Sequence, residues 1–168
     1  MKILLVCTAN ICRSVMAGGI FTKLLSASPG TPAIRVQSAG IDALEGMAPD
    51  RNTSEVCSAH GIDIESHRAR QLTKDMLKET DIALCMEINQ KERILRAFPA
   101  HSEKIFLLKN YHRASPIEDA SIEDPFGKPK KYYEECFDEI EQEVQRIIAF
   151  IQAKQPDMND LSENDSLA

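Results

Sequence analysis

The chain has 168 residues, of which 43% are hydrophobic and 27% charged, a composition typical of one globular domain with a sizeable core. Its formal net charge is −6, but four of these negative charges are the acids that follow Pro156, which leaves about −2 on the rest of the chain. These numbers exclude the strongly basic surface of a nucleic-acid-binding protein.

Neither a signal peptide nor a membrane partner is expected. The first apolar run, residues 3–6, ends too soon for a signal peptide, and nothing approaches the roughly 18 apolar residues of a membrane span. Five cysteines form an odd set without the spacing of a secreted scaffold, which predicts reduced thiols and a cytoplasmic location. They are Cys7, Cys12, Cys57, Cys85 and Cys136. Cys7 and Cys12 are too far apart for a zinc knuckle, and no metal is expected.

The first predicted element is a buried parallel strand at residues 2–6, because this short run is apolar on both faces and rich in branched side chains. A helix follows, since apolar residues recur every four positions at Met16, Ile20 and Leu24 until a break near Ser28. Further along, the sequence predicts a strand at 34–37, a turn at 38–40, and a helix that follows Pro49 and Asp50 and runs to about His60-Gly61. It then predicts strands at 82–86 and 104–108 separated by a charged helix at 90–98, and an amphipathic helix at 133–151.

This alternation of strands and helices predicts a doubly wound α/β domain over residues 1–155, with a mainly parallel sheet covered by helices on both faces. Residues 156–168 are polar and acidic, which predicts a disordered tail. Ligands of such sheets bind beyond the carboxyl ends of the strands. Residues 7–14 hold that place after the first strand.

The loop at residues 7–14 reads CTANICRS and has the position of an anion-binding nest, in which backbone N–H groups and a helix N-terminus face a negative charge. It lacks the glycines and the lysine of a nucleotide-binding loop. Arg13 instead supplies a planar fork that fits two oxygens of a tetrahedral phosphate. These positive groups favour the thiolate of Cys7 over the thiol, which makes its sulfur a candidate nucleophile at neutral pH.

Each residue of this loop also has a simpler interpretation. Cys7 alone reads as a small buried hydrophobe, and Arg13 as a surface residue or an ion pair at a helix start. Ser14 is either a helix cap or a hydrogen-bond partner of the Cys7 sulfur. Asn10 suits a left-handed backbone conformation in a tight loop. Cys12 either fills the loop or is a thiol able to form a disulfide with Cys7.

A thiolate that attacks phosphorus needs an acid to protonate the leaving oxygen, and Asp124 is the best candidate. Pro125 favours an extended conformation at Asp124, and Gly127 permits a turn directly after it. An Asp-Pro pair is also a common turn starter.

Other titratable residues compete with Asp124 for the role of acid or base. Glu123 and Asp119 lie in the same segment, and composition does not separate them from Asp124. His67 and His60 are candidate bases. Both rank below Asp124, because a lone histidine is more often structural.

The spacing Cys7-x5-Arg13-Ser14 directly after the first strand, with Asp124-Pro125 late in the chain, resembles the low-molecular-weight protein tyrosine phosphatase family. The likeness covers about residues 2–152. Further matching stretches are Ser38-Ala39-Gly40, Ser66-His67-Arg68-Ala69-Arg70-Gln71-Leu72-Thr73 and Leu84-Cys85-Met86.

The resemblance implies a four-stranded parallel sheet, a reaction without metal or cofactor, and a role for each matching residue. Cys7 would be the nucleophile, Arg13 the phosphate clamp, and Asp124 the general acid and then the base. The implied phosphate-binding loop comprises Thr8, Ala9, Asn10, Ile11, Cys12, Arg13 and Ser14, and the polar network that supports it comprises Asn10, Ser14, Ser38 and His67.

The sequence departs from the family pattern at several positions. Ala9 replaces a common glycine, which would cost about 1 kcal/mol and distort the loop if position 9 needed a positive φ. Val15 replaces a common proline. Gly18 replaces a common acid, and with Gly19 it weakens the first helix by up to about 1 kcal/mol per glycine.

The implied pocket wall consists of Ile11, Leu44 and Phe126. Ile11 is apolar where the protein-arginine phosphatase branch has threonine, and Phe126 is suited to stack on a substrate ring, so a phosphotyrosine protein is the expected substrate. The resemblance is to the bacterial branch, whose partners include tyrosine kinases of polysaccharide synthesis. Three alternatives remain: a protein-arginine phosphatase, a reductase similar to arsenate reductases, and a non-catalytic phosphoanion-binding module.

Overall fold

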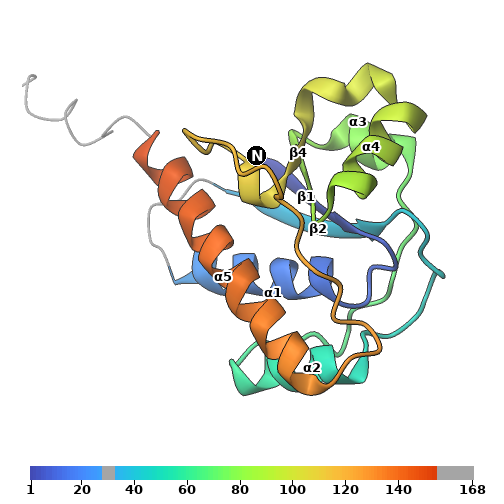
Figure 1. Cartoon of the computed structure of the whole chain (residues 1–168), viewed down its shortest axis with the longest axis vertical. Helices are drawn as coiled ribbons and strands as arrows, with labels where there is room; N and C mark the ends of the chain where they lie inside the picture. The colour runs from blue at the N-terminus through green and yellow to red at the C-terminus, as the bar shows by residue number, and fades with distance from the viewer. Residues whose placement is uncertain (28–32, 155–168) are drawn as a thin grey trace, which may run out of the picture.

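The computed structural model describes residues 1–27 and 33–154 (Figure 1). In chain order its elements are β1 (Lys2–Cys7), α1 (Arg13–Ser26), β2 (Arg35–Gly40), α2 (Arg51–Ala59), α3 (Lys74–Glu79), β3 (Ile82–Cys85), α4 (Ile88–Ala97), the 3₁₀ helix η1 (Pro99–Lys104), β4 (Ile105–Leu107), the 3₁₀ helix η2 (Leu108–Asn110) and α5 (Lys130–Ala153).

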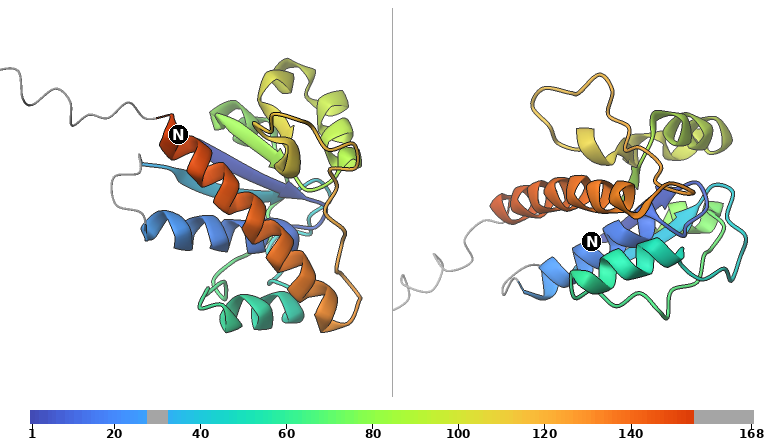
Figure 2. Two further views of the ribbon diagram at one scale, coloured as in Figure 1. Left: turned by 60° about the vertical axis from the view of Figure 1, so that its left-hand side comes forward. Right: turned by 60° about the horizontal axis from the view of Figure 1, so that its bottom comes forward.

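The four strands form one parallel sheet in the order β2-β1-β3-β4. Helices α1, α2 and α5 cover one face and α3 and α4 the other (Figures 1 and 2). The expected doubly wound α/β fold is therefore confirmed. Strand β1 lies between two others, so the loop that follows it stands at the centre of the carboxyl edge of the sheet.

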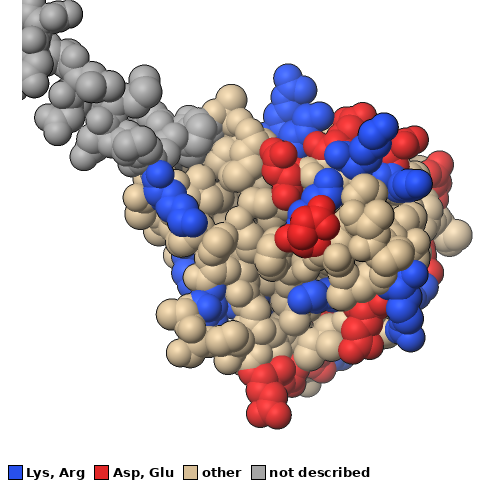
Figure 3. Space-filling view, turned by 90° about the horizontal axis from the view of Figure 1, so that it is seen from above, with Lys and Arg blue, Asp and Glu red and all other residues tan. Residues whose placement is uncertain are grey.

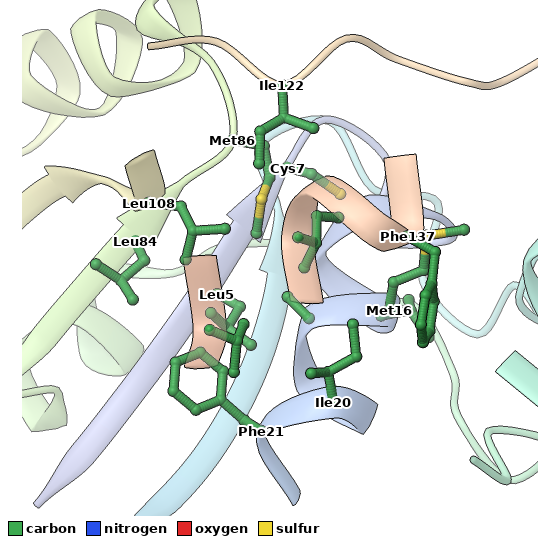
Figure 4. Packing of buried hydrophobic residues seen from close by; sticks show 14 of the residues in the cluster. Leu5, Cys7, Met16, Ile20, Phe21, Leu84, Met86, Leu108, Ile122 and Phe137 are labelled. Atoms are coloured by element: carbon green, nitrogen blue, oxygen red, sulfur yellow. The ribbon is translucent and has the colours of Figure 1, made fainter. Parts of the chain in front are cut away.

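Side chains of β1 alternate between two hydrophobic cores. Ile3, Leu5 and Cys7 pack with α1 and α5, whereas Leu4 and Val6 pack with α3 and α4. Figure 4 shows Cys7 near Met86 and Ile122 in the first of these cores. Because both faces of the strand are buried, its sequence is continuously apolar rather than alternating. The first core extends to the base of the candidate site.

The predicted strands and helices were found, with shifts of one to three residues at most ends. The predicted turn at 38–40 is wrong, because these residues pair with residues 5–7 and continue β2 to Gly40. Helix α3 was not predicted, since six residues give too few turns for a periodic pattern. Thr73 caps its N-terminus, since its hydroxyl accepts a hydrogen bond from the Met76 amide at 3.2 Å. The expected tail at 156–168 and the break near Ser28 lie outside the described residues.

Helix α1 carries two adjacent glycines with different surroundings. A Cβ built on Gly19 would lie 2.4 Å from Cγ2 of Ile62, so Gly19 allows the segment after α2 to approach the helix closely. A Cβ on Gly18 would meet only Cδ1 of Leu5, at an ordinary 3.8 Å. Packing therefore explains the glycine at position 19 and not the one at position 18.

Over the face seen in Figure 3, basic side chains are interspersed with acidic ones. None of the helices in residues 1–27 and 33–154 is long and apolar enough to cross a membrane.

Candidate active site

The site begins where β1 ends at Cys7 and α1 begins at Arg13, as the sequence predicted. Cys7 is only 3% exposed. Its Sγ accepts a hydrogen bond from the Asn10 amide at 3.3 Å and lies 3.0 Å from the hydroxyl oxygen of Ser14. The Asn10 amide and the Ser14 hydroxyl thus both contact the Cys7 sulfur beside the N-terminus of α1.

Asn10 holds the loop in shape. It has a φ of +58°, the left-handed conformation expected at this position. Its side-chain amide donates to Ser14 Oγ at 2.8 Å and to Ser38 Oγ at 2.9 Å, and its Oδ1 accepts from the Arg70 amide at 3.0 Å. The backbone carbonyl of Asn10 lies 2.9 Å from Nε2 of His67. Ser38 and His67 therefore contact the loop through Asn10.

Ala9 does not strain the loop in the way that its replacement of glycine suggested. Among the described non-glycine residues, positive φ values occur at Asn10 and His112, not at Ala9. The residue with the left-handed conformation is Asn10, as the sequence predicted, so position 9 does not need a glycine for this reason. The main reason for expecting a distorted, non-catalytic loop is therefore removed.

Gly40 lies directly beneath the loop. A Cβ on Gly40 would stand 2.5 Å from the Thr8 carbonyl oxygen and 2.9 Å from the Ala9 carbonyl carbon. The end of β2 can approach the loop this closely because residue 40 lacks a side chain. This contact gives the Ser38-Ala39-Gly40 motif a steric reason.

Arg13 is a buried cation, only 1% exposed. Its guanidinium donates to the Ile122 carbonyl at 2.9 Å, to Oδ2 of Asp124 at 2.7 Å, and to a carboxylate oxygen of Glu87. Burial lowers the pKa of this guanidinium, but the charge of Asp124 and the hydrogen bond to Glu87 outweigh it, so the pKa of Arg13 is raised. Its Nε is buried and has no hydrogen-bond partner among the described residues.

The structure brings Asp124, rather than its rivals, to the arginine. The second carboxylate oxygen of Asp124 accepts from the Phe126 amide at 3.1 Å, and Gly127 has a φ of +75°, which completes the expected turn. Glu123 instead pairs with Lys128. Asp119 accepts from the Ser121 amide, and His60 packs against Phe137.

Sequence reasoning missed Glu87 and Gln90, which lie after the carboxyl end of β3. Glu87 binds Arg13, and Gln90 donates from Nε2 to Thr8 Oγ1 at 3.1 Å and to Glu87 at 3.1 Å. Gln90 Oε1 in turn accepts from the Glu87 amide at the start of α4. The available signal was the position of both residues behind a predicted strand, where parallel sheets place their ligand-binding groups.

The remaining cysteines are less suited to catalysis than Cys7. Burial raises the pKa of the thiols of Cys12, Cys85 and Cys136 to about 12. Cys85 is fully buried within β3, and Cys136 lies on α5. Neither forms the exposed downstream pair that an arsenate reductase needs to pass oxidation along. All five cysteines are free thiols.

The implied pocket wall has one buried and two exposed members. Ile11 is 7% exposed, whereas Leu44 is 70% and Phe126 59% exposed. Arg93 of α4 forms a bidentate ion pair with Asp42, both distances being 2.7 Å, and so ties the Leu44 segment to α4.

Within the described ranges, no group of three or more His, Cys, Asp or Glu side chains could hold a metal ion.

The parallel fold and the loop from Cys7 to Arg13 define the class of the protein: an α/β phosphatase. The chain belongs to the low molecular weight phosphotyrosine protein phosphatase family, whose sequence profile matches residues 2–157. It is 37% identical over 151 residues to a protein of Ralstonia nicotianae named probable low molecular weight protein-tyrosine-phosphatase EpsP. The matched region covers 90% of this chain and 96% of that protein.

Solved structures of arginine phosphatases are also similar. The YwlE arginine phosphatase of Geobacillus stearothermophilus is 34% identical, with a TM-score of 0.82 over 92% of this chain and 94% of that one. A YwlE variant with serine in place of cysteine, described as carrying a phosphorylated active-site serine, is 26% identical with a TM-score of 0.85 over 92% and 98% of the two chains.

Proposed function

We propose that the chain hydrolyses phosphotyrosine in proteins through a cysteinyl-phosphate intermediate. In the first step the Cys7 thiolate attacks phosphorus, the bond to the phenolic oxygen breaks, and Asp124 gives its proton to that oxygen. In the second step Asp124 takes a proton from water as the water attacks phosphorus, and the Cys7 thiolate leaves as inorganic phosphate forms.

The observation that carries this proposal is the convergence of Cys7, Arg13 and Asp124 at the end of β1. The guanidinium of Arg13, the first residue of α1, donates to Asp124 at 2.7 Å. The Cys7 sulfur contacts the amide of Asn10 and the hydroxyl of Ser14, the second residue of α1. The orphaned Nε of Arg13 is a free donor for a phosphate oxygen. Arg13 and the loop amides would balance the charge of the phosphoryl group, a task that a metal ion performs in other phosphoryl-transfer sites.

Ser14 is suited to the second step. Its hydroxyl lies 3.0 Å from the sulfur and accepts a hydrogen bond from the Asn10 amide group. A hydroxyl whose oxygen already accepts one bond directs its proton to another acceptor, here the sulfur. Donation to the departing thiolate would stabilise it as a leaving group.

Phosphotyrosine is the favoured substrate because the wall is apolar at Ile11 and carries the exposed ring of Phe126. The amide of Phe126 donates to Asp124, so a ring stacked on Phe126 would lie beside the acid.

We propose a bacterial tyrosine kinase of polysaccharide synthesis as a candidate phosphoprotein partner. A cytoplasmic location is proposed because the mechanism needs a reduced Cys7.

Phosphoarginine is the second candidate substrate, favoured by the similarity to YwlE structures. Kinetics on matched peptides that carry phosphotyrosine, phosphoserine or phosphoarginine separate the candidates. We expect the highest kcat/KM with phosphotyrosine. A higher value with phosphoarginine would reassign the substrate while leaving the cysteine chemistry intact.

Two variants test the chemistry itself. Asp124→Ala is expected to accumulate a phosphoenzyme on Cys7, visible by mass spectrometry after rapid quenching, because water is no longer deprotonated in the second step. Cys7→Ser is expected to abolish turnover. An unchanged rate in Cys7→Ser would end the proposal.

A further inference from the structure

A cavity of about 530 Å³ that is open to solvent is lined by residues of α1, β2 and the segment 61–70. Figure 2 shows α1 beside the segment that follows α2. Small-molecule sites in proteins have volumes of roughly 300–1,000 Å³. The cavity is therefore large enough for a small ligand, and the proposed phosphatase reaction does not use it.

The wall of this cavity is shared with the phosphate loop. Ser38 and His67 both line it, and both contact Asn10, through Ser38 Oγ at 2.9 Å and His67 Nε2 at 2.9 Å. Arg70 also lines the cavity, and its backbone amide donates to Asn10 Oδ1 at 3.0 Å. A ligand that touches these residues would act on the residue that holds the loop in shape.

The lining combines an apolar part with cationic groups. Its apolar side chains are Val15, Val36, Ile62 and Ile64. Lys23 and Arg70 are its cations, and Asp63 is the acid among the described lining residues. Such a surface suits a ligand with an apolar body and a negative group.

Lys23 and Arg70 each have further hydrogen-bond donors that could bind such a ligand. Lys23 Nζ donates to the His60 carbonyl at 2.7 Å, and one Arg70 nitrogen donates to the Ser38 carbonyl at 3.0 Å. An ammonium has three donors and a guanidinium five. Asp63 accepts a hydrogen bond from the Glu65 amide at 2.9 Å, which occupies one of its oxygens locally.

Gly18 is a lining residue whose lack of a side chain is not explained by helix packing. It lines the cavity, and helix packing leaves room for a Cβ there, with Leu5 at 3.8 Å as the nearest atom. Glycine in a helix interior costs up to about 1 kcal/mol relative to alanine. Glycine at position 18 adds no side-chain atoms to the cavity lining.

We propose that this cavity is an effector site for a small aromatic carboxylate, whose binding is coupled through Ser38 and His67 to anion binding in the phosphate loop. The carboxylate contacts Lys23 and Arg70, and the ring lies on the aliphatic side chains. Because the ligand contacts Ser38 and His67, which hold Asn10, we expect its binding to strengthen anion binding in the loop, and the coupling is reciprocal.

Titration of the full chain with 2-naphthoate tests the site, with the uncharged 2-naphthamide as the control ligand. Calorimetry and methyl NMR of Val36, Ile62 and Ile64 are recorded with and without saturating vanadate, an anion that occupies the phosphate loop. We expect millimolar or tighter binding of 2-naphthoate in both conditions, at least tenfold weaker binding of the amide, and vanadate affinity about fivefold higher with the probe bound.

Two variants locate the probe. Lys23→Gln is expected to weaken its binding severalfold, whereas Lys78→Gln, in the equivalent last turn of α3, leaves binding and activity unchanged. Gly18→Leu fills the cavity and is expected to abolish binding. Competition between probe and vanadate, equal binding by all variants, or no binding at millimolar concentration would overturn the proposal.

Unchanged vanadate affinity with the probe bound would overturn the coupling. These titrations do not depend on turnover. The inactive Cys7→Ser chain is expected to bind the probe as the wild type does, so failure of the proposed catalytic function and failure of the effector site are distinguishable.

Discussion

Arg13 is the residue around which the site is assembled. It is a buried cation that carries two carboxylate partners and one carbonyl, drawn from segments that lie 74 to 111 residues away in sequence. An unpaired buried charge would cost several kcal/mol, so these partners are needed for the guanidinium to stay inside the protein. They also fix the plane of the guanidinium, as the phosphate-binding role proposed for Arg13 requires.

Replacing Glu87 with glutamine tests this fixing role. Glu87→Gln keeps an oxygen for the arginine but removes the negative charge, so the guanidinium is held less firmly for the phosphoryl group. We expect about a tenfold loss in kcat/KM, equivalent to ~1.4 kcal/mol. Glu92→Gln on the exposed side of α4 serves as the control and is expected to retain wild-type kinetics. Equal kinetics in the two variants would contradict the role assigned to Glu87.

His67 makes the unfolding free energy of the protein depend on pH. Burial lowers the pKa of His67, with the neighbouring Arg70 and Arg68 acting in the same direction against the hydrogen bond to Asn10. The unfolded chain, in which histidine has a pKa near 6.5, therefore binds more protons than the folded chain below about pH 6.5. The stability that the neutral imidazole contributes is complete above about that pH and is lost as the pH falls toward the folded-state pKa.

Urea unfolding of wild type and His67→Gln at a series of pH values measures this effect. We expect the unfolding free energy of the variant to vary less between about pH 5 and 6.5 than that of the wild type. His112→Gln is a second test of the same linkage, because burial and the charges of Lys154 and Arg146 also lower the pKa of His112, so its pH slope is expected to decrease in the same direction. If His67→Gln and wild type had the same pH slope, the neutral state assigned to His67 would be wrong.

At the scale of elements, the end of β2 fixes the position of the phosphate loop by direct backbone contact. Gly40 pairs with Cys7 in the sheet and lies against the carbonyls of Thr8 and Ala9. These neighbours are backbone atoms, which cannot rotate away as a side chain can. The loop and the strand therefore have to move together if residue 40 acquires a side chain.

Gly40→Ala is expected to lower the unfolding free energy by about 1–3 kcal/mol, the usual cost of overpacking, and to lower kcat/KM as well. Gly61→Ala is the matched control. Its φ of +68° makes alanine costly by about 1–2 kcal/mol, but its Cβ would meet nothing within 4 Å. Denaturant titration and steady-state kinetics on both variants separate the effects, since only Gly40→Ala should impair turnover.

The sequence predicted the parts of the site that are contiguous in the chain. Cys7, Asn10, Arg13 and Ser14 lie at one junction between β1 and α1, and their relative positions follow from a strand that passes into a helix. Glu87 was not predicted, because its contact depends on β3 pairing beside β1, which local patterns do not specify. The concern about Ala9 came from a family comparison, and the structure shows that Asn10 takes the left-handed position instead.

At the scale of the whole molecule, α5 holds the long segment that leads to Asp124. Arg146 donates to Glu143 at 2.7 Å, to the Tyr111 carbonyl at 2.8 Å and to the Leu108 carbonyl at 3.2 Å. Lys109 adds an ion pair to Glu139 at 2.7 Å and a bond to the Ser121 carbonyl at 3.3 Å. Ser121 is three residues from Asp124, so α5 anchors the acid through this segment.

Arg146→Met tests the anchor, because it keeps the apolar stem and removes the guanidinium. The carbonyls of Tyr111 and Leu108 and the largely buried Glu143 then lose a partner, and we expect a loss of about 2–3 kcal/mol in unfolding free energy. Hydrogen exchange at residues 108–113 is expected to accelerate. Arg96→Met is the control, since this arginine is 72% exposed and its ion pair spans 4.0 Å, so a change within about 0.5 kcal/mol is expected. A similar loss in both variants would show that α5 does not anchor this segment through Arg146.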